Sequence, residues 1–277
     1  MFGLIKKMIR KRTFPLRAAF FYWCYGRRWR YSARKLCPKG DTVLILAPHA
    51  DDEYIGCGGL ISKYKDTAKL HAFLCSYLGA DPSEENRRRR EKEFKNSCEE
   101  MRVFCHIADR DMENELRRCI DEVKPGYIFL TTLVDPHREH RELNFVLQKI
   151  LGECGYAGKI VWYSVTMPVA PDFLNCYIPM SKLQDIEKWD GFYRLYPSQS
   201  HMHIERFRTE ERFAGRAAGC AYAEGFVEMA YGKWHDAVGR WDEDYGDILD
   251  RIKREGRESC LLEVYQTSGR LYRSLFR

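Results

Sequence analysis

A short buried strand that leads directly into a polar, glycine-rich turn is the feature that most constrains the fold of this chain. Residues 43–47 are aliphatic and have the length of a fully buried strand, which Pro48 ends. A glycine-rich stretch follows at residues 56–59. Between them stand four ionisable side chains, His49, Asp51, Asp52 and Glu53. Because ligands of open α/β sheets collect beyond the carboxyl ends of strands, this cluster lies where a binding site is expected.

Two interpretations of the acidic pair are open from this stretch alone. Adjacent buried aspartates without a partner would be costly, which indicates a bound cation, with zinc or iron as the first candidates. Alternatively, acidic residues 51–53 suit the positive end of a helix dipole and need no metal. A second polar segment at residues 135–141, DPHREHR, also follows a hydrophobic run, residues 127–134. Two strand ends with histidine-rich clusters favour the metal.

The hydrophobic pattern alternates between strands and helices from residue 42 to residue 165. A parallel sheet covered on both faces is the expected result, a Rossmann-like three-layer α/β sandwich. Residues 56–59 do not form a G-x-G-x-x-G fingerprint, so a dinucleotide is not expected. Beyond residue 168 we predict a loop and helix at 171–190 and a helix at 204–227. The predicted strands are 43–47, 70–77, 103–107, 127–134 and 160–165, and the predicted helices are 54–65, 84–101, 113–123 and 143–151.

The net charge of +6 is unevenly distributed. Residues 1–40 contain twelve Lys or Arg and no Asp or Glu, and nine large aromatic side chains lie among them. The remaining residues carry 34 basic and 40 acidic side chains. We therefore predict a basic aromatic arm at 1–40, an α/β domain at 41–230 and a C-terminal helical extension at 231–277.

Basic residues interleaved with large aromatics are typical of segments that bind an anionic membrane interface. A solvated or partner-binding arm is an alternative, and nucleic acid would also attract the charge, but we favour the membrane surface over both. No apolar run approaches the roughly 20 residues that span a bilayer. The eleven cysteines form no C-x-x-C pair, which favours a reducing compartment. We expect a cytoplasmic protein, peripheral at the inner face of the membrane. The sequence does not predict an oligomeric state.

Two motifs carry a resemblance to a known family. Residues 48–53, PHADDE, and 136–141, PHREHR, resemble the paired signature of the zinc-dependent PIG-L/LmbE-like de-N-acetylases. Ala50 stands where that family usually has proline, and Glu139 replaces its usual aspartate. The resemblance implies hydrolysis of the acetyl group of an N-acetylglucosamine-type sugar. The basic arm favours a lipid-linked or other glycoconjugate as the carrier of that sugar.

The resemblance also assigns roles to individual residues. His49, Asp52 and His140 would bind zinc or another divalent metal, and two imidazoles with one carboxylate leave a position open for water. Asp51 would be the general base, and His137 would stabilise the oxyanion or protonate the leaving amine. Glu53 and Glu139 would support the turn or the ligands through hydrogen bonds.

Arg90 is a candidate for a substrate contact, because a guanidinium binds phosphate or sugar oxygens as a fork. The competing interpretation is a solvated helix face, since residues 87–90 are four consecutive arginines. Two other functions are compatible with the motifs. One is a non-catalytic sugar-binding protein of the same fold, and the other is a non-haem iron enzyme, whose chemistry usually occurs on an all-β barrel.

Overall fold

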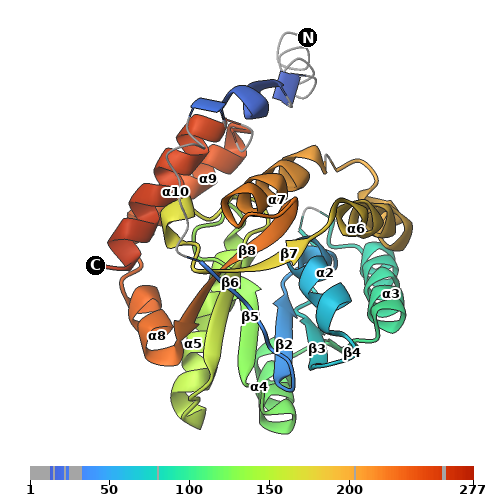
Figure 1. Ribbon diagram of the computed structural model, residues 1–277. Helices are drawn as coiled ribbons and strands as arrows, with labels where there is room; N and C mark the ends of the chain where they lie inside the picture. The colour runs from blue at the N-terminus through green and yellow to red at the C-terminus, as the bar shows by residue number, and fades with distance from the viewer. Residues whose placement is uncertain are drawn as a thin grey trace.

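An eight-stranded mixed sheet forms the centre of the protein (Figure 1). The computed structural model describes residues 13–14, 16–21, 23–24, 33–79, 81–202, 204–257 and 260–277. The strand order is β1-β7-β8-β6-β5-β2-β3-β4. The strands are β1 (Arg34–Lys35), β2 (Thr42–Ala47), β3 (Lys69–Leu74), β4 (Phe104–Ile107), β5 (Tyr127–Thr131), β6 (Lys159–Tyr163), β7 (Cys176–Met180) and β8 (Tyr222–Ala230).

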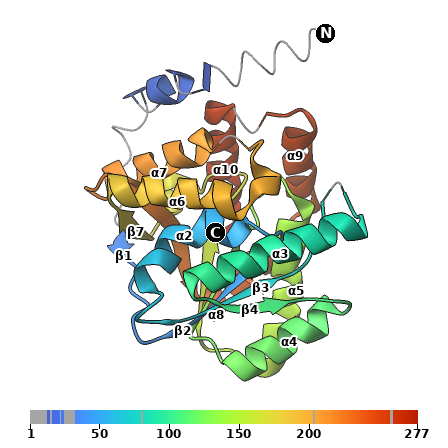
Figure 2. The same cartoon turned by 90° about the vertical axis from the view of Figure 1, so that its right-hand side faces the viewer.

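Helices cover both faces of this sheet, as the α/β sandwich prediction requires. In Figure 2, α3 and α4 lie on opposite sides of β3 and β4. The helices are α2 (Asp52–Tyr64), α3 (Glu84–Met101), α4 (Met112–Val123), α5 (Arg138–Cys154), α6 (Lys182–Leu195), α7 (Glu205–Ala217), α8 (Tyr231–Gly239), α9 (Glu243–Arg254) and α10 (Leu261–Leu275), with short 3-10 turns at Pro171–Phe173 and Pro197–Gln199.

The two faces explain why the central strands are continuously apolar. Successive side chains of β2 alternate between two separate cores, with Leu44 and Leu46 in one and Val43 and Ile45 in the other. The first core lies against α4, α5, α8, α9 and α10. The second lies against α2, α3, α6 and α7. A strand buried on both sides needs apolar residues at every position.

The sheet is parallel except at one strand. β8 runs antiparallel to both of its neighbours, β6 and β7, whereas the remaining strand pairs are parallel. The predicted helix at 204–227 was therefore wrong in its second half. Helix α7 ends at Ala217, Gly219 adopts a positive φ of 73°, and the chain returns as β8. Charge pairs in α7 extended the apparent helical pattern past this glycine turn.

The prediction of a loop and helix at 171–190 missed β7. Pro179 is an unusual residue in a strand, because proline cannot donate a ladder hydrogen bond. In the structure, β1 pairs only with Cys176 and Tyr177. At Pro179 the outer side of β7 is therefore the edge of the sheet among the described residues, where proline is tolerated.

Glycines allow α2 to lie directly on the sheet. A Cβ atom at Gly56 would collide with the ring of Tyr163, and one at Gly59 would collide with Met180. The glycine-rich stretch therefore serves close packing of a helix, as expected for a turn that lacks a nucleotide fingerprint.

Part of the predicted basic arm lies outside the described residues, namely residues 1–12, 15, 22 and 25–32. Of the helices that the structure describes, none is both long and apolar enough to cross a bilayer. At the other end of the chain, α10 contributes Leu271 and Tyr272 to the same core as β5 and β6. The hydroxyls of Tyr272 and Thr132 share a hydrogen bond of 2.6 Å.

Candidate metal centre and acid–base site

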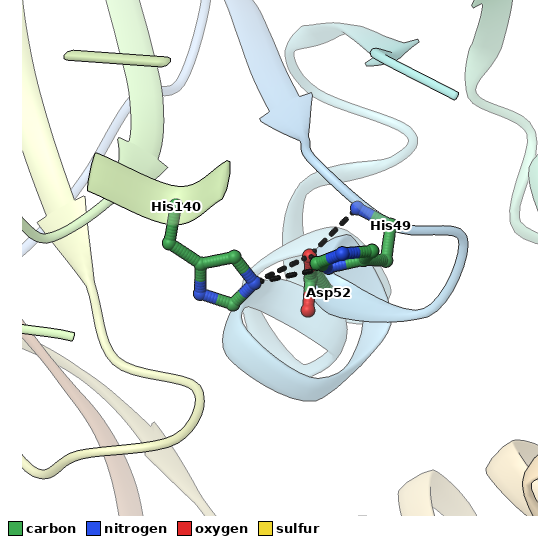
Figure 3. A group of neighbouring side chains, drawn as sticks. All are labelled: His49, Asp52 and His140. Carbon is green, nitrogen blue, oxygen red and sulfur yellow. Dashed lines mark hydrogen bonds and ion pairs between the residues drawn. The ribbon is translucent and has the colours of Figure 1, made fainter. Parts of the chain in front are cut away.

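The two polar clusters predicted from the sequence meet at one edge of the sheet. β2 and β5 are adjacent and parallel, so their carboxyl ends lie together. His49 follows β2, and Asp52 is the first residue of α2. His140 lies in the first turn of α5, which begins at Arg138, five residues before the predicted start. Figure 3 shows the His49 and His140 rings and the Asp52 carboxylate converging on one point.

Three donor atoms form a nearly equilateral triangle. His49 Nδ1 lies 3.1 Å from His140 Nε2, and both nitrogens lie 3.2 Å from Asp52 Oδ2. Ligands at 2.0–2.1 Å from a tetrahedral zinc ion would be separated by about 3.3 Å. The three atoms therefore fit a single small divalent cation, and two imidazoles with one carboxylate are a donor set that such a cation prefers.

The electrostatics of the triangle also favour a cation. Burial raises the pKa of Asp52, but His140 and His49 outweigh this effect and hold it below its ordinary value. Burial lowers the pKa of His140, but the carboxylates of Asp135 and Asp52 raise it to about 10. Asp52 is thus an ionised carboxylate in a buried place, and the protonated imidazole of His140 balances its charge; a divalent cation would take over this role when His140 gives up its proton.

Asp51 lies beside the triangle on a strained backbone. Its φ of 138° and ψ of −22° are rare for a residue with a side chain, and such strain concentrates at functional sites. Burial raises the pKa of Asp51 to about 6, although Arg90 acts to lower it. A carboxylate with a pKa in this range can accept a proton near neutral pH.

Arg90 is held in the interior and does not lie on a solvated face. Arg90 is only 9% exposed, and its Nη2 lies 3.1 Å from Asp51 Oδ1. The same nitrogen donates to the carbonyl of Ala50. Nη1 donates to Glu93 and Ser198 at 3.3 and 2.9 Å. The guanidinium therefore fixes the turn that carries Asp51, and a direct substrate contact stays a prediction.

His137 caps the start of α5 on the other side of the triangle. Its ring centre lies 5.0 Å from that of His140 and 5.9 Å from that of His49. Nδ1 contacts Thr166 Oγ1 at 2.7 Å and Asp135 Oδ1 at 3.3 Å. These contacts occupy Nδ1, so the nitrogen that can exchange a proton with a ligand is Nε2.

The sequence reasoning missed Asp135. This fully buried carboxylate accepts hydrogen bonds from the backbone N–H groups of His137 and Thr166 at 2.8 and 3.1 Å. Its Oδ1 also lies 3.3 Å from His140 Nδ1, close enough for an ion pair but not aligned for a hydrogen bond. An aspartate two residues before a histidine at a strand end was the available signal.

The two glutamates that flank the motifs occupy different surroundings. Glu53 is buried, accepts the backbone N–H of Asp51 at 3.2 Å and accepts the hydroxyl of Tyr196. Burial raises the pKa of Glu53 to about 8. Glu139 is partly exposed and makes no hydrogen bond or ion pair with a side chain that the structure describes. Glu53 thus supports the strained turn, whereas a supporting role for Glu139 stays a prediction.

Comparison with known families identifies the segment that carries both motifs. Residues 44–151 match the family model PIG-L, described as GlcNAc-PI de-N-acetylase. We call these residues the PIG-L segment. The PIG-L segment contains the three candidate metal ligands together with Asp51 and His137, and it confirms the resemblance inferred from the motifs.

A curated relative extends the comparison of the PIG-L segment. The chain is 30% identical over 110 residues to a probable N-acetyl-alpha-D-glucosaminyl L-malate deacetylase 2 of Bacillus subtilis (strain 168). That alignment covers 32% of this chain, and the chain spans half of the relative, 50% of its length.

The structural neighbours include N,N'-diacetylchitobiose deacetylase from Pyrococcus horikoshii, with a TM-score of 0.54 and 21% identity over 68% of this chain and 83% of the other. The conserved protein TT1542 from Thermus thermophilus has the same TM-score of 0.54 and the same 21% identity, covering 68% and 94% of the two chains. At this identity the neighbours establish the fold, which confirms the α/β sandwich with its mostly parallel sheet.

Proposed function

We propose that this protein is a zinc-dependent hydrolase that removes the acetyl group from an N-acetylglucosamine-type sugar. The observation that carries the proposal is the triangle of His49 Nδ1, Asp52 Oδ2 and His140 Nε2, with Asp51 and His137 beside it. The match of residues 44–151 to the PIG-L family model and the similarity to a probable deacetylase of Bacillus subtilis support the choice of reaction.

The metal ligands would supply one part of the chemistry. His49, Asp52 and His140 would hold a divalent zinc ion, and this ion would supply a lowered pKa of bound water, about 7, and polarisation of a carbonyl oxygen. Neighbouring side chains diverge, so Asp51 is not expected to bind the same ion as Asp52. Its carboxylate is therefore available to accept a proton from the attacking water.

Asp51 and His137 transfer the protons of amide hydrolysis. Water adds its oxygen to the acetyl carbon, and Asp51 takes one proton from it. As the carbon–nitrogen bond breaks, His137 Nε2 delivers a proton to the sugar nitrogen, which leaves as an amine while acetate forms. Thr166 and Asp135 hold His137 Nδ1, which fixes the orientation of the ring during this transfer.

The carrier of the sugar is proposed from the charge of the chain. Twelve Lys or Arg within residues 1–40 suit an anionic environment, so we propose a lipid-linked or other glycoconjugate substrate handled at the cytoplasmic face of a membrane. A substrate panel that includes both lipid-linked and water-soluble N-acetylated sugars tests the carrier of the sugar separately from the deacetylation reaction.

The test combines product detection with two variants. The purified, zinc-loaded protein is incubated with N-acetylglucosaminyl lipids and nucleotide sugars, and free acetate and the deacetylated sugar are measured by mass spectrometry. We expect Asp51→Asn to abolish acetate release while bound zinc, measured by elemental analysis, is retained. His140→Ala should lose both.

Each proposed role can fail separately in this experiment. Full activity of Asp51→Asn would contradict its role as general base, and full zinc content of His140→Ala would contradict its role as ligand. Zinc binding without turnover of any sugar would favour a non-catalytic sugar-binding protein. Activity that depends on iron and oxygen would favour the non-haem iron alternative.

A further inference from the structure

The N-terminal helical segment packs against the rest of the protein through one face. The described residues between 13 and 24 are helical. In Figure 1 this blue segment lies next to one end of α10. The ring of Phe21 stacks on that of Tyr265 with a centroid distance of 5.3 Å. The buried cluster that attaches the segment to α10 consists of Phe14, Ala18, Phe21, Leu261 and Tyr265.

The opposite face of this segment presents large apolar side chains to solvent. Leu16, Phe20 and Trp23 are 75%, 66% and 61% exposed. They recur at the i, i+4, i+7 spacing of one helical face. At 100° per residue, this face is centred about 160° away from the face formed by Phe14, Ala18 and Phe21. The segment therefore has an attached face and an exposed apolar face on opposite sides.

Basic residues flank the exposed apolar face in the sequence, and three more lie in α9, shortly before the helix to which the segment is attached. Residues 6–12 and 27–30 contain five and three Lys or Arg and flank the segment in the chain. Arg251, Lys253 and Arg254 are exposed in the last turn of α9, a few residues before the start of α10, where the segment is attached. Acidic side chains are absent from residues 1–40.

We propose that Leu16, Phe20 and Trp23, which we call the exposed arm face, insert into the headgroup boundary of an anionic lipid bilayer. Large apolar and aromatic side chains on one side of a helix with basic residues around it are the properties of segments that bind at this boundary. The basic residues supply attraction to anionic headgroups, and the apolar side chains supply insertion. Nucleic acid would satisfy the charges but would leave three large apolar side chains in water.

The attachment to α10 makes this docking a property of the whole protein. α10 also contributes Leu271 and Tyr272 to the core that contains β5 and β6. Binding of the exposed arm face would therefore hold the α/β domain, with its metal centre, at the membrane surface. The inference goes beyond the proposed reaction and does not depend on it, because membrane binding is measured without substrate.

Co-sedimentation with lipid vesicles tests the proposal on the full-length protein. One set of vesicles is pure phosphatidylcholine, and the other contains about 30% phosphatidylserine. We expect binding to the anionic vesicles and roughly tenfold weaker binding of the double variant Leu16→Ser/Phe20→Ser. The matched control is Leu183→Ser/Phe104→Ser, which removes the same two residue types at positions 63% and 56% exposed on α6 and β4. The control should bind like wild type.

Each result either supports or overturns the proposal. Circular dichroism of the three proteins establishes that the variants are folded. Failure of the wild type to bind anionic vesicles overturns the proposal, as does equal binding by the Leu16→Ser/Phe20→Ser variant or equal loss in the control. Binding to single-stranded RNA or duplex DNA without binding to vesicles would assign the basic arm to nucleic acid. Loss of vesicle binding with unchanged turnover of a water-soluble sugar leaves the proposed reaction intact.

Discussion

Arg90 Nη2 lies 3.1 Å from Asp51 Oδ1, and the same nitrogen donates to the backbone carbonyl of Ala50. The arginine thus contacts both the proposed general base and the strained turn that presents it. Because the guanidinium acts to lower the pKa of Asp51, it keeps the carboxylate ready to accept a proton.

We predict that Arg90→Gln lowers kcat by about 10- to 100-fold with little change in KM, because the loss affects the positioning of Asp51 and not ground-state binding. Arg90→Lys should recover part of the lost kcat, since it restores the charge but not the fork. Steady-state kinetics on the sugar identified by the panel measures both constants. The control is Arg88→Gln, because Arg88 is 78% exposed on the same helix. A rise in KM at constant kcat would instead assign Arg90 to the substrate.

Asp135 touches both histidines of the second motif, and its removal should weaken the metal centre. We predict that Asp135→Asn lowers zinc affinity or activity by about 10- to 100-fold, the usual cost of losing a carboxylate behind a ligating imidazole. Competition with a chromogenic chelator gives the affinity. Glu142→Gln is the control, because Glu142 lies on the same helix, has a side chain that is 40% exposed and pairs with the exposed Arg138. An equal loss of zinc affinity in the two variants would contradict the proposed role of Asp135.

Lys188 is a buried cation shared by two carboxylates. Its Nζ lies 2.5 Å from Glu211 and 2.6 Å from Glu224, and its side chain is 3% exposed. Lys188→Met would leave both glutamates buried without their cation, and we predict a loss of about 3–5 kcal/mol in the free energy of unfolding. Urea denaturation measures it. Lys149→Met, which removes an exposed ion pair with Glu113, should cost less than about 1 kcal/mol.

Glu210 on α7 should make stability depend on pH. Its Oε1 is buried and has no hydrogen-bond partner among the described residues, and burial raises its pKa from 4.5 to about 8. The folded state therefore holds a proton that the unfolded state has released. The contribution of protonated Glu210 to the free energy of unfolding is fully present below pH 4.5 and is lost as the pH rises towards about 8.

We predict that Glu210→Gln, which cannot ionise, melts at a higher temperature than wild type at pH 8.5 and at a similar temperature at pH 4.5. Differential scanning calorimetry across this range measures the difference. Glu205→Gln is the control, because Glu205 lies on the same helix at a more exposed position and is paired with Arg208. If the melting temperatures of Glu210→Gln and wild type differed by the same amount at all pH values, Glu210 would not be the source of the pH dependence.

The parts of this protein that the sequence predicted are those determined by local patterns. Residues 43–47 had to be a doubly buried strand, and the candidate ligands His49, Asp52 and His140 came from the resemblance of two motifs, each of which follows a hydrophobic run. Their meeting at one point followed from the parallel order of β2 and β5. Asp52 lies both at the N-terminus of α2 and in the triangle of candidate metal ligands. The helix-dipole and the metal interpretations of the acidic residues are therefore compatible.

The parts that could not be predicted depend on partners distant in the sequence. Glu224 accepts the backbone N–H groups of Gly59 and Leu60 at 2.6 and 2.8 Å, a contact that spans more than 160 residues. The burial of Arg90 depends on Glu93 and on Ser198, which the four-arginine pattern does not indicate. The strand β8 was hidden by the charge pattern of α7, because only its pairing with β6 and β7 makes it a strand.

The position of β8 orders the assembly of the chain as it leaves the ribosome. β8 is the last strand in the sequence, yet it lies between β6 and β7, so β7 and β1 have no place on the sheet until residue 230 has been synthesised. The strands β2 to β6, which carry every candidate ligand, can pair earlier. A nascent chain that stalls before β8 would therefore expose the unpaired edge of β6 to other unfinished chains. We expect aggregation during biosynthesis to begin at β6.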